Sequence, residues 1–280
     1  AALAVNGGDI TINSEDDALH SATAVTITSG TLLLAAGDDG IHSDDLVAIS
    51  GGDITVSGSY EGVEGGTITV SDGTIDVTAS DDGFNAAGGA DSSASSAPRG
   101  NDAFAVDTSK SLVISGGTVT VNADGDGLDS NGTMTISGGT IYVSGPTNAG
   151  NGALDSGSSM TISGGTIIAA GSAGMAQTFD ESSTQASISY TFTTVQQAGT
   201  TISLKDASGN VIASYTPEKV YQSVVISSPE LTIGQSYALY TGSTSVESIT
   251  LSGVVTTIGS GNGGMNGGFG GQRPNGGRRG

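Results

Sequence analysis

Short runs of alternating apolar and polar residues recur along the first two thirds of the chain at nearly constant spacing. Each run follows one or two glycines, as in Gly-Asp-Ile-Thr-Ile at 8–12 and Gly-Thr-Ile-Tyr-Val at 139–143. Period-two alternation is typical of β-strands, and a repeat of about 20–30 residues built only of strands indicates a solenoid. The first apolar residues of the runs are Ile10, Leu32, Ile54, Ile75, Val119, Ile141 and Ile167, spaced by 22, 22, 21, 44, 22 and 26 residues.

We therefore expect an all-β protein in which residues 1–177 form a right-handed parallel β-helix solenoid of about seven or eight coils. The hand follows the usual chirality of parallel crossover connections. Equivalent positions of successive coils then stack about 4.8 Å apart, and Ile, Val and Leu fill a narrow core. We interpret the spacing of 44 residues as one coil with a loop insertion at 86–109, a segment rich in Ala, Ser and Gly.

The pattern loses its period from Gln177 onward. Six of the twelve aromatic residues lie between Tyr190 and Tyr240, and the Ser-Gly-Asn turn within residues 205–212 predicts a hairpin. Because the open strand edge of a solenoid promotes aggregation unless it is covered, we predict that residues 178–259 form an antiparallel β cap. Residues 260–280 have the composition of a Gly-rich disordered tail.

The charge of the chain is concentrated in the predicted solenoid. The net charge is −21, and residues 1–180 hold 23 of the 28 acids but only Arg99 and Lys110 as bases. Such a surface disfavours nucleic acid and anionic membranes as partners, and the absence of cysteine excludes disulfides and thiolate metal sites. No apolar run approaches the ~20 residues that span a bilayer. Concentrated carboxylates instead favour hard cations such as Ca²⁺.

An acidic element recurs at one position of the repeat. It reads Asp-Asp-Ala-Leu at 16–19, Asp-Asp-Gly-Ile at 38–41 and Asp-Asp-Gly-Phe at 81–84. Stacked coils bring these acids into columns, where carboxylates about 5 Å apart repel unless a cation lies between them. Asp-Asp-Gly is also an ordinary turn sequence, so a merely solvated acidic surface is the alternative. The candidate Ca²⁺ ligands are Asp16, Asp17, Asp38, Asp39, Asp44, Glu61, Glu64, Asp81, Asp82, Asn85, Asp126 and Asp129.

Other chemistry has less support in the sequence. His20 and His42 occupy equivalent coil positions, where imidazoles suit a transition metal, although stacked surface residues are the commoner interpretation. A polysaccharide lyase needs a base beside a neutralised carboxylate, and only Arg99 and Lys110 are available in the solenoid. A glycoside hydrolase needs two carboxylates with separated pKa values, and no pair stands out. We therefore expect no catalytic residues.

The chain resembles a family of secreted bacterial carbohydrate-binding proteins. The resemblance is carried by residues 38–66 and 71–89, by the repeated Ser-Gly-Gly-Thr runs and by the predicted cap at 205–242. The resemblance covers about residues 1–258. It implies a right-handed parallel β-helix similar to polysaccharide lyases, bound calcium, and affinity for cellulose and for acidic plant polysaccharides such as pectin. Matched residue by residue, it makes Asp38, Asp39, Asp81 and Asp82 calcium ligands, with Glu61, Glu64, Asn85, Asp126 and Asp129 as partners on adjoining turns.

The resulting prediction is a non-catalytic, secreted or cell-surface protein that binds plant cell-wall polysaccharide. A β-helix polysaccharide lyase and a structural or adhesive solenoid are the alternatives. Cellulose recognition usually relies on stacked rings, and the predicted helix offers only Tyr60, Tyr142, Phe84 and Phe104, so the carbohydrate-binding residues stay unassigned. Exposed Ca²⁺ can bridge protein and sugar carboxylates, so we expect polygalacturonate binding to depend on calcium.

Overall fold

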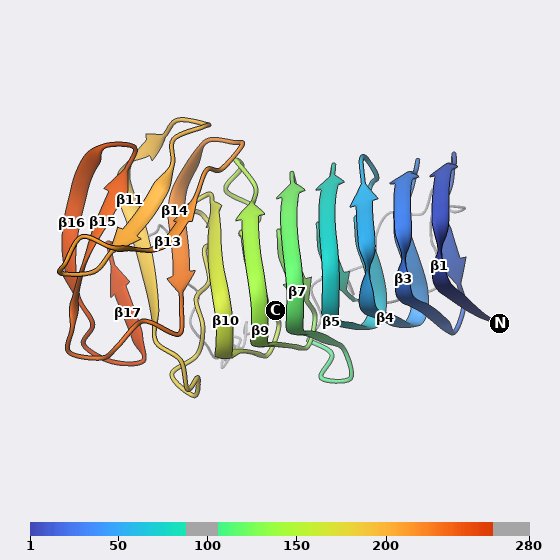
Figure 1. Ribbon diagram of the computed structural model, residues 1–280, viewed down its shortest axis with the longest axis horizontal. Coiled ribbons are helices and arrows are strands. Elements are labelled where there is room, and N and C mark those ends of the chain that lie inside the picture. The colour runs from blue at the N-terminus through green and yellow to red at the C-terminus, as the bar shows by residue number, and fades with distance from the viewer. Residues whose placement is uncertain (88–105, 260–280) are drawn as a thin grey trace, which may run out of the picture.

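A parallel sheet of long strands forms most of the molecule (Figure 1). The computed structural model describes residues 1–87 and 106–259, and within these ranges all regular secondary structure is β-strand. The chain is a β-solenoid of about seven turns, which confirms the predicted fold class. The long strands, in spatial order, are β1 (Ala2–Asn13), β3 (Ala24–Ala35), β4 (Ile41–Val56), β5 (Val63–Ala79), β7 (Ser111–Ala123), β9 (Thr133–Ser144) and β10 (Ser159–Gly171).

Short strands form a further column along one corner of the coils. They are β2 (Leu19–Ser21), β6 (Phe84–Ala86) and β8 (Leu128–Ser130), and the first residues of β4 and β5 complete the column between them. All of these pairings are parallel. Each coil therefore presents the same short segment at the same corner.

The register of the coils follows the spacing of the sequence repeats. Ile10 pairs with Leu32, and Ile141 pairs with Ile167. Ile75 pairs directly with Val119 although their positions differ by 44, so the long interval does contain an insertion and no additional coil. Most of that insertion, the predicted tail at 260–280, Arg99 and Phe104 lie outside the described residues.

The interior is an aliphatic stack. The inward positions of β7 alternate with outward ones, and Leu112, Ile114, Val119 and Val121 are all fully buried. Each such side chain contributes roughly 1.5–3 kcal/mol through burial. Phe84, which the sequence suggested as a surface ring, is fully buried in this core, because it pairs in register with apolar residues of both neighbouring coils.

The solenoid ends where the sheet changes direction. Strand β14 (Tyr221–Ser227) pairs antiparallel with β10, β11 (Ser187–Gln196) pairs antiparallel with β14, and β17 (Val255–Ile258) pairs parallel with β11. A separate antiparallel sheet contains β13 (Val211–Tyr215), β12 (Ile202–Lys205), β15 (Ser236–Thr241) and β16 (Thr244–Thr250), and its β12–β13 hairpin is the predicted one. No described helix is long and apolar enough to cross a membrane.

Side chains from this C-terminal part dock onto the last coils. The rings of Tyr142 and Tyr215 stack at a centroid distance of 4.9 Å, and the Tyr215 hydroxyl lies 2.8 Å from Ser144 Oγ. Lys219 Nζ lies 3.0 Å from Asp124 Oδ1. Tyr142 is therefore engaged in internal packing, and part of its ring face is unavailable for stacking on a sugar.

Candidate metal centre

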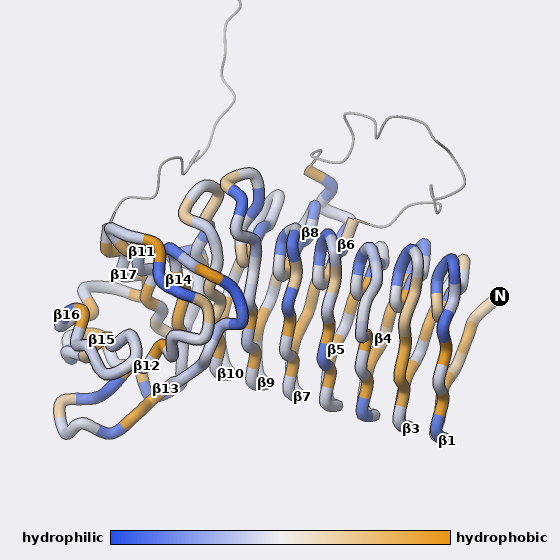
Figure 2. The backbone as a smooth tube through the Cα atoms, turned by 90° about the horizontal axis from the view of Figure 1, so that it is seen from above, coloured by the Kyte–Doolittle hydropathy of each residue, from blue (hydrophilic) through white to orange (hydrophobic). Residues whose placement is uncertain are grey.

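Acidic and amide side chains line the corner at which each coil enters its short strand. We call this line the acidic edge and define it as residues 16–20, 38–42, 60–64, 81–85, 125–129 and 151–155. Backbone hydrogen bonds set its register: Gly40 N–H donates to Glu61 O at 3.0 Å, and Gly83 N–H donates to Asp126 O at 2.9 Å. Figure 2 shows hydrophilic turns recurring at the same corner of successive coils.

The close approach of the coils requires a glycine after four of the turn acids: Asp39, Glu61, Asp82 and Asp126. A Cβ on Gly40 would lie 2.6 Å from Gly62 O, and a Cβ on Gly83 would lie 2.6 Å from Gly127 O and 2.3 Å from a methyl of Val121. Real Cβ atoms do not tolerate such contacts with backbone. The Asp-Asp-Gly and Asp-Gly sequences therefore hold the acids and the tight corner together.

The turn acids also have a structural role. Asp17 Oδ1 accepts a hydrogen bond from Asp39 N–H at 3.0 Å, and Asp39 Oδ1 accepts one from Glu61 N–H at 3.3 Å. Further along, Asp82 Oδ1 accepts one from Asp126 N–H at 2.6 Å. Each of these carboxylates thus binds the equivalent amide of the following coil.

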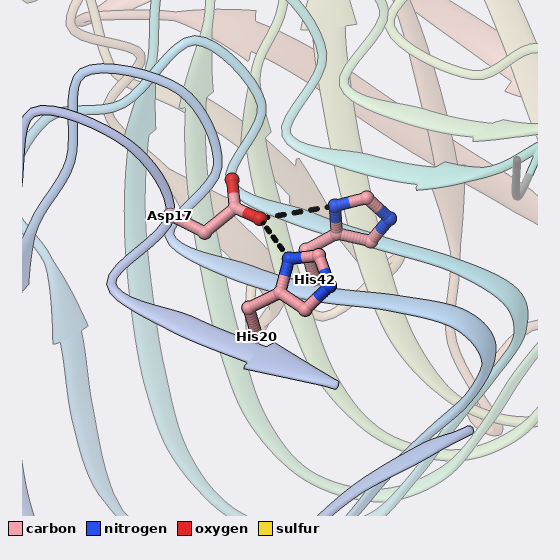
Figure 3. Close-up of side chains that lie close together, drawn as sticks. All are labelled: Asp17, His20 and His42. Atoms are coloured by element: carbon pink, nitrogen blue, oxygen red, sulfur yellow. Dashed lines mark hydrogen bonds and ion pairs between the residues drawn. The ribbon is translucent and has the colours of Figure 1, made fainter. Parts of the chain in front are cut away.

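The two histidines lie next to one carboxylate. Asp17 Oδ2 is 2.6 Å from His20 Nδ1 and 3.2 Å from His42 Nδ1, and the two rings are 4.9 Å apart (Figure 3). Burial would raise the pKa of Asp17, but the hydrogen bonds from His42 and His20 lower it below its usual value. Burial would lower the pKa of His42, but Asp17 and other carboxylates raise it.

The other ring nitrogen of His42 faces two more acids. Its Nε2 is 3.5 Å from Glu64 Oε2 and 3.6 Å from Asp44 Oδ1, and it has no hydrogen-bond partner. We call Asp17, His20, Asp39, His42 and Glu64, together with the adjacent Asp44, the histidine end of the acidic edge.

Buried carboxylates crowd together next to this ring. Burial raises the pKa of Asp39 to about 6, and burial with the neighbouring charges of Glu61 and Asp39 raises that of Glu64 to about 10. Burial also raises the pKa of Glu61, whose Oε2 accepts a hydrogen bond from Asn85 Nδ2 at 3.0 Å. Protons or bound cations are therefore needed to hold these groups together.

The opposite part of the edge contains carboxylates without histidine. We call Asp82, Asp126, Asp129 and Asp155 the carboxylate end. Oxygens of Asp126, Asp129 and Asp155 lie within 4.8 Å of one another. Burial and the neighbouring charge of Asp82 raise the pKa of Asp126 to about 8 and that of Asp129 to about 9.

Three carboxylates gathered this closely can share one calcium ion. With Ca–O distances of about 2.4 Å, two ligands of one ion lie at most about 4.8 Å apart. Asp155 also accepts a hydrogen bond from Gln177 Nε2, and Asp126 accepts one from Gly152 N–H. These bonds fix the orientation of two of the three carboxylates.

The sequence-predicted ligands all lie on or beside this edge. Asp16, Asp17 and Asp38 form another group with oxygens within 4.8 Å, and Asp81 and Asp82 act electrostatically on Glu61 and Asp126. Asp155 was missed, because the loop before it lengthens the last repeat. The repeated Leu-Asp-Ser at 128–130 and 154–156 was the signal that pointed to it, since Leu128 bridges Leu154.

Comparison with known proteins gives a partial match. A family model described as carbohydrate-binding domain-containing protein matches residues 1–40, a range that includes β1, β2, β3 and the first two acidic turns. Comparison with curated proteins and with solved structures gave no significant match. The match over the first coils indicates carbohydrate binding.

Proposed function

We propose that the protein is a non-catalytic extracellular module that binds acidic plant cell-wall polysaccharide through calcium held at the carboxylate end. The observation that carries the proposal is the carbohydrate-binding family match at residues 1–40, on a chain whose acidic edge gathers carboxylates within reach of one ion. The resemblance of the repeats and of residues 205–242 to calcium-containing carbohydrate-binding proteins supports the same function.

Charge complementarity explains why calcium is part of the proposal. A protein with a net charge of −21 repels a polyuronate. Asp126, Asp129 and Asp155 are only partly buried, so an ion held between them keeps coordination positions open toward solvent. Ca²⁺ accepts six to eight oxygens, so three protein carboxylates leave room for a sugar carboxylate and water.

Acidic glycans fit the surface better than cellulose does. Flat crystalline cellulose is usually bound by a row of exposed aromatic rings. Of the rings suggested by the sequence, Phe84 is buried and Tyr142 is stacked on Tyr215. We therefore expect stronger retention on polygalacturonate than on cellulose.

The proposal is tested by measuring retention of the protein on immobilised polygalacturonate and on cellulose. Each measurement is made with calcium and then with excess chelator. We expect retention on polygalacturonate with calcium and release by chelator at a temperature where the protein stays folded. Asp129→Asn should abolish retention, while Asp53→Asn, an exposed acid outside the edge, should preserve it.

Three outcomes would contradict the proposal. Unchanged retention in chelator, with the fold intact, would remove calcium from the binding mechanism. New unsaturated ends in the pectin would identify a lyase. The absence of both retention and cleavage would favour a structural or adhesive solenoid.

A further inference from the structure

His42 is a buried imidazole surrounded by carboxylates. Its side chain is 1% exposed. Nδ1 lies 3.2 Å from Asp17 Oδ2 and 3.5 Å from Asp39 Oδ2, while Nε2 faces Glu64 and Asp44. Nothing in the calcium proposal for the carboxylate end uses this residue.

Asp17 orients the ring. The hydrogen bond between Asp17 Oδ2 and His42 Nδ1 directs the Nε2 lone pair of the neutral imidazole toward Glu64 and Asp44 (Figure 3 shows Asp17 beside both rings). A metal-binding histidine usually has this arrangement, in which the non-ligating nitrogen donates to a carboxylate.

Nε2 is a buried nitrogen without a hydrogen-bond partner, and a cation placed on it would satisfy the nitrogen and both neighbouring carboxylates. A proton would leave those carboxylates at 3.5 and 3.6 Å, well beyond the ~2.7–2.9 Å of charge-assisted hydrogen bonds. Two ligands on one tetrahedral zinc lie roughly 3.4 Å apart, given bond lengths of about 2.0–2.2 Å. The observed spacing fits a shared metal better than a shared proton.

We propose that His42 Nε2, Asp39 and Glu64 bind a divalent first-row transition metal of the Zn²⁺ class, with Asp44 beside them. Donor atoms of Asp39, His42 and Glu64 lie within 4.8 Å of one another, so these three already form a compact group. Asp44 is 35% exposed and lies at the solvent side, where an ion enters.

The donor set also separates this site from the carboxylate end. Calcium takes oxygen ligands, whereas imidazole nitrogen suits zinc, copper and nickel. The acidic edge would therefore carry two kinds of metal at equivalent corners of different coils. This inference does not depend on carbohydrate binding.

The proposal is tested by isothermal titration calorimetry. The metal-stripped full-length protein is titrated with Zn²⁺ in the presence of excess Ca²⁺. We expect one tight equivalent that calcium does not displace, and a tetrahedral visible spectrum when Co²⁺ replaces Zn²⁺. Glu64→Gln removes a ligand without changing shape and should weaken binding by more than the ~10–100-fold that an outer-shell partner contributes, whereas Asp17→Asn should weaken it ~10-fold.

Two matched variants keep the test specific. Glu15→Gln changes an exposed acid near the same edge, and His20→Gln removes the exposed ring; both should bind Zn²⁺ with nearly unchanged affinity. The proposal is overturned if Zn²⁺ does not bind, if excess Ca²⁺ displaces it, or if Glu64→Gln and His42→Gln both bind as the parent protein does. It is equally overturned if His20→Gln alone abolishes binding.

Discussion

The two ends of the acidic edge have the same backbone ladder, but only one of them has an imidazole among its carboxylates. At the histidine end His42 lies between carboxylates, and Asp17 has a pKa below its usual value. At the carboxylate end Asp129 occupies the equivalent position in the short-strand column, and its pKa rises to about 9. One residue type at one position of the repeat therefore decides whether the corner offers an imidazole nitrogen or only carboxylate oxygens to a cation.

This difference shows that a solenoid can keep one backbone framework while the side chains at each corner change. The glycines and ladder hydrogen bonds are common to both ends, whereas the outward residue varies from His to Glu, Asn and Asp. Coils contact mainly their neighbours, so each corner can acquire its own ion preference without a change in the core.

The largest expected effect comes from breaking the scaffold that both ends share. Gly83→Ala places a Cβ 2.3 Å from a Val121 methyl and 2.6 Å from Gly127 O, so the coils must separate. We expect a loss of about 3 kcal/mol in the free energy of unfolding, measured by guanidinium denaturation. Gly58→Ala is the matched control, since its Cβ would meet nothing within 4 Å. Equal stability of the two variants would contradict the tight corner.

Calcium should stabilise the folded protein by binding at the carboxylate end. At a concentration 100 times its dissociation constant, a ligand of the folded state adds about 2.7 kcal/mol, which shifts the Tm of a protein of this size by several degrees. Asp129→Asn should abolish this calcium-dependent shift in a thermal melt. Asp53→Asn should retain it, and an equal loss in both variants would indicate a non-specific charge effect.

The pH dependence of the calcium-free protein should come from buried carboxyl groups at both ends, among them Glu64, with a folded pKa of about 10. Asp126 and Asp129 have folded pKa values of about 8 and 9, above their unfolded values, so the folded state binds more protons between about pH 4 and pH 9. The free energy of unfolding should therefore fall as pH rises through this window. The raised pKa of His42 acts in the same direction.

Thermal melts in chelator from pH 5 to pH 8 measure this dependence. We expect the Tm to fall, and Asp129→Asn to reduce the slope by replacing a carboxyl group with a neutral amide. A Tm that rises over the same range would show that these buried carboxylates ionise freely.

The smallest expected effect concerns the exposed histidine. The pair between His20 and Asp17 has a partly exposed imidazole, and exposed ion pairs contribute about 0.2–1 kcal/mol. His20→Ala should therefore cost about 0.5 kcal/mol in denaturation experiments. A cost as large as that of losing a buried ion pair, about 3 kcal/mol, would mean that the two histidines act as one unit.

Much of the fold and of the acidic edge could be predicted from the sequence. The spacing of the strand runs gave the coil register, and the Asp-Asp-Gly repeats placed their acids in one column, because a solenoid stacks equivalent positions. Asp155 escaped this reasoning, since its coil is 26 residues long instead of 22.

The electrostatic state of each residue could not be predicted in this way. His20 and His42 have similar sequence contexts, yet one is exposed and the other buried, because His42 has a coil on each side that covers it. Phe84 likewise occupies the column of Ile41 and Val63, and its inward direction depends on a register that only the folded coils fix.

The carboxylate-to-amide bonds along the edge all point the same way along the chain. Asp17 accepts from Asp39, Asp39 from Glu61, and Asp82 from Asp126. The edge therefore has a mechanical polarity: loss of Asp17, Asp39 or Asp82 frees an amide in the coil that follows. Loss of a carboxylate at one corner would weaken the C-terminal side of that corner first. Amide hydrogen exchange would show this as faster exchange in the following coil than in the preceding one.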